Sequence, residues 1–199
     1  MRVTDLPPRI DIEYGTRPAH DLLRDAAARF HQVPISHVAL THECLRCGSD
    51  EHGRPMLLAT AAIRRPAYVS LARAGDVSVV AVTDAGHVGV DVEAEGAAEF
   101  EGFAEVALHP AERAPGTVDP TRSWVRKEAV LKAYGLGLAV DPGDLRVDDH
   151  GLVAWDSPYP SPGSVWLRDI AAPGLVLAVA VLPDVDLATL SITVRSATD

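Results

Sequence analysis

The sequence predicts a mixed α/β protein made of two similar lobes. Apolar residues recur at helical spacing in two segments, 17–30 and 121–135. Valine-rich runs of strand length flank each of these segments. Each half of the 199-residue chain therefore combines one helix with several strands, and the chain is long enough to bury a core. We expect one lobe at 1–86 and a second at 87–199, with no sequence repeat between them.

The first half begins with the helix predicted over 17–30, which can start at Thr16 or Pro18. A strand follows at the start of 36–57 and continues into a polar loop that contains glycine. Residues 67–83 then predict a strand, an interruption around Ala74 to Asp76 and a second strand rich in valine.

The second half begins with a strand at 87–93, reached through the turn TDAGH. A short helix is expected within 99–114, where Pro110 opens another turn. Two further strands are predicted at 164–170 and 174–182.

The strongest helix prediction is 121–135. Thr121 or Ser123 can cap its start, and Gly135 can end it.

Composition indicates a protein of the cytoplasm. No apolar stretch is long enough to span a bilayer, and residues 1–15 lack the apolar segment of a signal peptide. Two cysteines are too few for a disulfide framework. We therefore expect a soluble cytoplasmic protein with no membrane partner.

The net charge of −10 disfavours nonspecific binding to nucleic acid or to an anionic membrane, which needs a basic surface. Residues 1–86 carry ten arginines, no lysine and ten acids, so the whole negative charge lies in 87–199. Arginine binds phosphate in a bidentate way, although codon bias alone would also enrich arginine over lysine. The neutral half is thus a candidate for binding an anion.

Two acids interrupt the apolar strand HVGVDVE. Because side chains alternate along a strand, Asp91 and Glu93 share one face, while Val90 and Val92 point the other way. Either that face is solvated, or a cation lies between the acids.

The helix at 121–135 supplies a third acid. Trp124, Glu128 and Lys132 are spaced by four residues and share a helix face, where Glu128 and Lys132 could simply form a surface ion pair worth about 0.2 to 0.5 kcal/mol. If Glu128 meets Asp91 and Glu93, the three carboxylates repel unless a cation joins them. Hard oxygen ligands with open positions suit Mg²⁺, and Lys132 could then neutralise a phosphate.

These two segments together resemble the signature of the 4'-phosphopantetheinyl transferases of the surfactin-synthetase-activating type. That signature is roughly (V/I)G(V/I)D, a variable spacer, and (F/W)xxKE(A/S)xxK. Its fixed positions are filled by Gly89, Asp91, Trp124, Lys127, Glu128, Ala129 and Lys132. HGRP at 52–55, LHPAER at 108–113 and GLGL at 135–138 resemble flanking elements of the family.

The resemblance implies a pseudo-twofold monomer with its active site in the cleft between the two lobes. It implies transfer of 4'-phosphopantetheine from coenzyme A to a serine of an apo acyl or peptidyl carrier protein, as in fatty acid, polyketide or nonribosomal peptide synthesis. This is a Mg²⁺-dependent holo-[acyl-carrier-protein] synthase activity that releases 3',5'-ADP.

The resemblance also implies the residue roles. Asp91, Glu93 and Glu128 would hold Mg²⁺, with Glu112 as an additional acid, and Glu128 would be the base for the serine proton. Lys132 would contact the phosphates. Four basic residues would bind coenzyme A: Arg54, Arg73, Lys127 and Lys132.

One departure from the family lies at residues 72–75. The family has Ser-His-Ser before a glycine, whereas this chain has Ala72, Arg73 and Ala74 before Gly75. A hydroxyl donor and an imidazole are lost, but Arg73 keeps a cation for the 3'-phosphate of coenzyme A.

The loop THECLRCGSDEHG carries the only two cysteines. Cys44 and Cys47, with His42 or His52, could close a tetrahedral zinc site. Because only one such cysteine pair is present and histidines are common in loops, we expect reduced thiols that shape the loop before Arg54 rather than zinc.

Two other functions use similar residues. A metal-dependent nuclease also clusters carboxylates with a lysine, but such sites commonly place the acid and the lysine close together on a strand. Here Lys132 lies on a predicted helix in the acidic half of the chain. A noncatalytic module that binds coenzyme A or a carrier protein is the alternative from another class, and the presence of Asp91, Glu128 and Lys132 argues against it.

Overall fold

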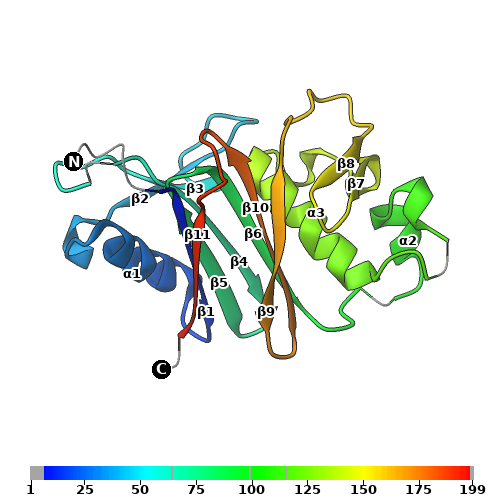
Figure 1. Cartoon of the computed structure of the whole chain (residues 1–199), viewed down its shortest axis with the longest axis horizontal. Coiled ribbons are helices and arrows are strands. Elements are labelled where there is room, and N and C mark those ends of the chain that lie inside the picture. The colour runs from blue at the N-terminus through cyan, green and yellow to red at the C-terminus, as the bar shows by residue number, and fades with distance from the viewer. Residues whose placement is uncertain (1–6, 64, 99, 115, 198–199) are drawn as a thin grey trace.

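Two β-sheets lie between two helices in the computed structural model, which describes residues 7–63, 65–98, 100–114 and 116–197 (Figure 1). The first sheet has the order β11-β1-β5-β4 and the second has the order β6-β10-β9. Their strands are β1 (Arg9–Gly15), β4 (Tyr68–Ala74), β5 (Val77–Thr83), β6 (Gly86–Ala94), β9 (Trp166–Ala172), β10 (Leu175–Pro183) and β11 (Ser191–Ala197). The predicted mixed α/β class is confirmed.

Two hairpins and three helices complete the fold. The hairpins pair β2 (Leu40–Glu43) with β3 (Arg54–Leu57) and β7 (Leu145–Val147) with β8 (Leu152–Trp155). The helices are α1 (Ala19–His31), α2 (Phe103–Ala107) and α3 (Pro120–Tyr134), with short 3₁₀ turns at Ile35–His37, Pro110–Glu112, Gly137–Ala139 and Pro142–Asp144.

The inner faces of the two sheets share one apolar core. Alternation along β6 turns Val88, Val90 and Val92 toward this core, where they meet residues of the first sheet such as Ile10 and Ile12. The two sheets also meet at their edges, because the backbone N–H of Val90 on β6 donates to Oγ of Ser70 on β4 at 3.0 Å.

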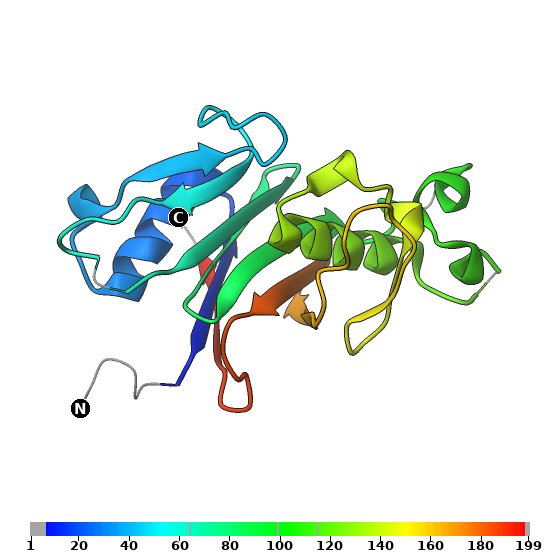
Figure 2. The same cartoon turned by 90° about the horizontal axis from the view of Figure 1, so that it is seen from above.

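The two long helices each cover the outer face of one sheet, and Figure 2 shows α1 and α3 on opposite sides of the strands. Leu22, Leu23 and Phe30 of α1 pack on the first sheet. Val125 and Ala129 of α3 pack on the second. The helix positions follow from their apolar stripes, because each stripe must be removed from water.

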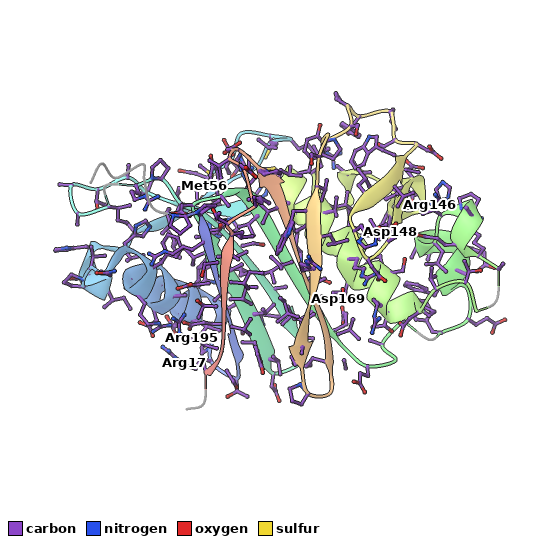
Figure 3. The ribbon with its side chains drawn as sticks, viewed as in Figure 1. Arg17, Met56, Arg146, Asp148, Asp169 and Arg195 are labelled. Carbon is purple, nitrogen blue, oxygen red and sulfur yellow. The ribbon has the colours of Figure 1, made fainter. Side chains whose placement is uncertain are left out.

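Helix α3 lies unusually close to β6. A Cβ added at Gly89 would clash with the carbonyl oxygen of Ala129 and the backbone nitrogen of Ala133. The neighbouring residues of β10 on that face, Ala178 and Ala180, are also small and fully buried. At the sheet edge, the Arg126 guanidinium donates to both carboxylate oxygens of Asp169, which Figure 3 labels on β9 beside α3.

The start of α3 differs from the sequence-based expectation. Asp119, not Thr121 or Ser123, is the N-cap, and its carboxylate accepts from the Arg122 N–H at 2.9 Å. The helix begins earlier because Pro120 suits the first helical position. Gly135 ends the helix in the left-handed region with φ 79°, as predicted.

Several other predicted elements are confirmed. Helix α1 occupies the predicted segment, and 67–83 forms the hairpin of β4 and β5. The segment 99–114 contains the short helix α2, although residue 99 itself lies outside the described residues.

The sequence pattern did not predict five of the strands in the described residues: β1, β3, β7, β8 and β11. The last strand, β11, returns from the second half of the chain and pairs in parallel with β1. The pseudo-twofold relation between two lobes, and their boundary at residue 86, stay predictions. Within the described residues, no helix is both long and apolar enough to span a membrane.

Gly89→Ala tests the contact between α3 and β6. The added methyl group has no space beside the α3 backbone, so the helix must shift, and we expect a loss of about 1 to 3 kcal/mol in the free energy of unfolding. Denaturant unfolding measures it. Gly143→Ala is the control, because its nearest obstacle is the Asp141 side chain at 3.1 Å, which can move. Equal stability of the two variants would contradict the close contact.

Candidate functional site

The acids of β6 face helix α3. Asp91 is buried and Glu93 is half-buried, on the side of the strand opposite Val90 and Val92. The predicted division of the strand into two faces is confirmed. Asp91 can therefore meet α3 directly, because Gly89 lets the helix approach the strand.

Glu128 and Lys132 lie one helical turn apart on the side of α3 that covers β6. The Lys132 ammonium donates to Oδ1 of Asp91 at 2.5 Å. Glu128 is 8% exposed and has no ion-pair partner among the described residues. Trp124, one turn earlier, instead stacks edge-to-face on Phe103 of α2, with ring centroids 6.0 Å apart. The helix thus joins a cation and a second acid to the acids of the strand.

Burial makes this group of acids unfavourable as it stands. Loss of solvent raises the pKa of Asp91 and of Glu128, and the Lys132 charge opposes this only in part. The pKa of Glu93 is raised by burial and then by the charge of Asp91. The acids therefore lie close enough to repel one another, and the single charge of Lys132 does not balance them.

Two carboxylate oxygens in this group have no hydrogen-bond partner in the structure: Oδ2 of Asp91 and Oε1 of Glu128 are both buried and unpaired. Unpaired buried oxygens are costly and uncommon. Hard oxygen ligands of this kind fit Mg²⁺. Among the described residues, however, the ligand atoms of Asp91, Glu93 and Glu128 do not all lie within 4.8 Å of one another. The donor oxygens suit a magnesium ion, and side-chain movement would be needed to bring all three acids onto one ion.

A cavity of about 560 Å³ opens beside Lys132. Its walls come from the loop between β2 and β3, from the middle of β4, and from the residues after α3. The lining includes Arg46, Arg54, Ser70, Leu136 and Tyr159. A cavity of this size is suitable for a small-molecule cofactor.

Arg54 lies at the wall of this cavity. Its guanidinium donates to Oε2 of Glu43, with Nη2 at 2.6 Å, and Nη1 lies 2.9 Å from Nδ1 of His87. Burial and the Arg54 charge lower the pKa of His87, so the imidazole stays neutral more readily. Arg54 is thus held in place from β2 and from β6.

Arg73 is exposed near the end of β4 and has no ion-pair partner in the described part of the chain. It is two residues beyond Leu71 and on the same strand face. Leu71 lines the cavity, whereas Arg73 does not. Its guanidinium remains available to an anion that extends past the cavity.

The structure does not bring Lys127 or Glu112 to the acids around Lys132. The Lys127 ammonium is fully buried and donates to Glu112 Oε2 at 2.6 Å and to the Ala107 carbonyl at 2.8 Å. Lys127 is one residue before Glu128, which turns it by about 100° around the helix axis. The two residues form an internal ion pair that holds the segment after α2 against α3. Lys127 does not line the cavity beside Lys132, and its contact with coenzyme A stays a prediction.

The cysteine loop lies at the outer wall of the cavity. Side-chain ligand atoms of Cys44, Cys47 and His52 all lie within 4.8 Å of one another. His42 instead faces His20, with their Nε2 atoms 3.5 Å apart. Of the two histidines considered from the sequence, only His52 joins the thiols.

The sequence did not indicate Ser70 or His87 as site residues. Ser70 lines the cavity while its Oγ links the two sheets, and His87 contacts Arg54. Neither belongs to a local motif, because both contacts depend on how distant strands meet. His87 does stand at the start of the HVGVDVE strand, which was the available signal.

The two acids of β6, and Glu128 and Lys132 of α3, fall within one region that matches a known family. Residues 87–158 match the family model of the 4'-phosphopantetheinyl transferase superfamily. The matched region runs from β6 through α3 to the residues after β8. No curated protein matches the chain significantly. The predicted similarity to the phosphopantetheinyl transferase superfamily is confirmed for residues 87–158, and the surfactin-synthetase-activating subtype stays a prediction.

Glu128→Gln tests the electrostatic cost of burying the acids beside Lys132. Folding raises the pKa of Glu128, so the folded state favours the protonated acid. The ionised side chain therefore weakens the fold at pH values above 4.5, the ordinary pKa of glutamate, and has no such effect well below that pH. Without added metal, we expect Glu128→Gln to raise Tm at pH 7.5 by about 2 to 4 °C. This shift corresponds to a gain of roughly 1 kcal/mol in the free energy of unfolding.

Thermal unfolding across pH measures this effect, and the difference in Tm should shrink as the pH falls toward 4.5. The matched control is Glu95→Gln, an exposed acid that follows β6. A gain for Glu128→Gln that is the same at acid and neutral pH would contradict the electrostatic explanation.

Proposed function

We propose that the chain transfers 4'-phosphopantetheine from coenzyme A to a serine of an apo acyl or peptidyl carrier protein. The serine oxygen forms a bond to the β-phosphorus of coenzyme A, the bond from that phosphorus to the departing nucleotide breaks, and 3',5'-ADP leaves. The main support is the pair of buried, unpaired carboxylate oxygens on Asp91 and Glu128 beside Lys132, within the matched transferase domain.

In this proposal, Asp91, Glu93 and Glu128 hold Mg²⁺, which when bound neutralises charge on the pyrophosphate. Glu128 accepts the serine proton, because it is the acid on α3 nearest to Lys132. The Lys132 ammonium has three hydrogens and uses one on Asp91, so it can also donate to a phosphate oxygen.

Coenzyme A would occupy the cavity beside Lys132. Arg46 and Arg54 line that cavity, and Arg73 extends the positive charge along β4. In this arrangement, residues 1–86 provide the coenzyme A side and residues 87–199 the metal side. We further propose that the two halves are related by a pseudo-twofold axis and that the protein acts as a cytoplasmic monomer.

Intact-mass spectrometry of several apo carrier proteins tests the reaction. Incubation with the enzyme, coenzyme A and Mg²⁺ should add a single phosphopantetheine to a serine, and chelation of the metal should stop the transfer until Mg²⁺ is restored. Asp91→Ala and Glu128→Ala should each reduce the rate by about 100-fold or more, because each removes a ligand from the site.

Glu95→Ala, which changes an exposed acid near the same strand, should leave the rate unchanged. Transfer that survives both chelation and Glu128→Ala would overturn the mechanism. Tight binding of coenzyme A without any transfer to the carrier proteins would favour the noncatalytic module.

Arg73→Ala tests recognition of the nucleotide end. A charge-assisted contact of about 1.5 to 3 kcal/mol would be lost, so the KM for coenzyme A should rise roughly 10- to 100-fold with little change in kcat. Arg24→Ala, at an exposed arginine of α1, is the matched control.

Dephospho-coenzyme A identifies the phosphate involved. If Arg73 contacts the 3'-phosphate, the unmodified protein should bind this analogue weakly and the variant should barely distinguish it from coenzyme A. Equal discrimination by the two proteins would show that Arg73 does not touch that phosphate.

A further inference from the structure

The loop between β2 and β3 gathers three side chains that bind transition metals. Sγ of Cys44, Sγ of Cys47 and a ring nitrogen of His52 all lie within 4.8 Å of one another. Sγ of Cys47 lies 3.4 Å from Nε2 of His52. A tetrahedral zinc ion with one thiolate and one imidazole would hold these two atoms about 3.6 Å apart. The pair therefore already has close to the separation that a shared zinc ion requires.

The backbone of the loop creates this arrangement. The N–H of Gly48 donates to the Cys44 carbonyl at 2.8 Å, and the N–H of Cys44 donates to the Ser49 carbonyl at 3.0 Å. Gly48 has φ 74°, a left-handed conformation that glycine adopts without strain. The tight turn that results places the two cysteines beside each other.

A second glycine returns His52 to the cysteines. Gly53 has φ 103°, and a Cβ there would clash with the carbonyl oxygen of Glu43. The backbone of β2 leaves no room for a side chain at Gly53, the residue just before β3. His52, the preceding residue of the loop, therefore lies beside Cys44. Two glycines thus give the three ligands their positions.

The surroundings of Cys44 favour its thiolate, which is the form that binds metals. Hydrogen bonds from the backbone N–H groups of Cys47 and Arg46 lower the pKa of the Cys44 thiol. Thiolate and imidazole ligands select zinc or a similar transition metal over Mg²⁺. The loop therefore differs in ligand chemistry from the acids around Lys132.

We propose that Cys44, Cys47 and His52 bind a zinc ion. Three protein ligands leave the fourth tetrahedral position for a water molecule. This replaces the expectation of simple reduced thiols, because the third ligand, which a single cysteine pair could not guarantee, lies beside them in the structure. The proposal does not depend on the transferase function.

The zinc ion would fix one wall of the cavity beside Lys132. Cys44, Leu45, Arg46 and Gly53 all line that cavity. The Leu45 side chain also reaches the end of α3, where its Cδ1 would lie 2.9 Å from a Cβ added at Gly135. A metal that holds the loop together therefore holds Arg46 and Leu45 in place.

Metal analysis of the full-length chain, purified without an affinity tag, tests the site. We expect about one zinc per chain, and after removal of zinc we expect Co²⁺ to give the intense visible bands and the thiolate-to-cobalt absorption of a tetrahedral site with two thiolates. Cys47→Ser should weaken Co²⁺ affinity by about 100-fold or more. His42→Ala, a histidine of the same hairpin outside the group, should bind metal normally.

His52→Cys provides a test that does not depend on loss of metal. It should retain the metal and increase the thiolate-to-cobalt absorption by roughly half, since three thiolates replace two. The proposal is overturned if reduced wild-type protein binds neither zinc nor Co²⁺, if Cys47→Ser binds them equally well, or if His52→Cys leaves the spectrum unchanged. All of these readouts are independent of carrier-protein transfer, so failure here leaves the proposed function untouched.

Discussion

The close contact between α3 and β6 is the constraint on which the rest of the site depends. Because Gly89 has no side chain, the backbone of α3 lies directly over the strand. Asp91, two residues further along the same face, then meets Lys132 at 2.5 Å, and Glu128 lies one turn away on the helix. A larger residue at position 89 would separate the strand acid from the helix lysine and acid. One missing methyl group thus determines whether the charged residues form a site.

The charged side chains on the two sides of α3 differ in how completely opposite charges balance them. On the side away from β6, Lys127 is buried against Glu112 and a backbone carbonyl, so its charge is matched and the pair is structural. On the β6 side, a single lysine faces three acids, and two buried oxygens remain unpaired. Such incomplete compensation is typical of functional sites, where stability is lowered in favour of binding. The imbalance is what a divalent cation would correct.

The loop of residues 44–53, which lines the same cavity, obtains its conformation in a different way. Loops usually obtain their conformation from packing, yet residues 44–53 are mostly exposed and have few apolar contacts available. Gly48 and Gly53 give this loop its turns, and Cys44, Cys47 and His52 would hold it further through the proposed zinc ion. The proposed zinc ion would therefore hold a wall of the cavity in place, whereas the proposed magnesium ion would act in the chemistry beside Lys132.

The sequence by itself determined the local features. Strand alternation placed Asp91 and Glu93 on one face, and helical spacing placed Glu128 and Lys132 on another, because both follow from backbone periodicity over a few residues. Gly135 as the end of α3 was predicted for the same reason.

Only the tertiary structure decided how distant segments meet. Sequence spacing could not show that Lys127 is enclosed with Glu112, that His52 rather than His42 joins the cysteines, or that β11 returns to pair with β1. The roles of Ser70 and His87 also depend on contacts that no local pattern specifies. The physical reason is that these interactions join residues brought together by burial of the shared core, and burial is a property of the whole chain.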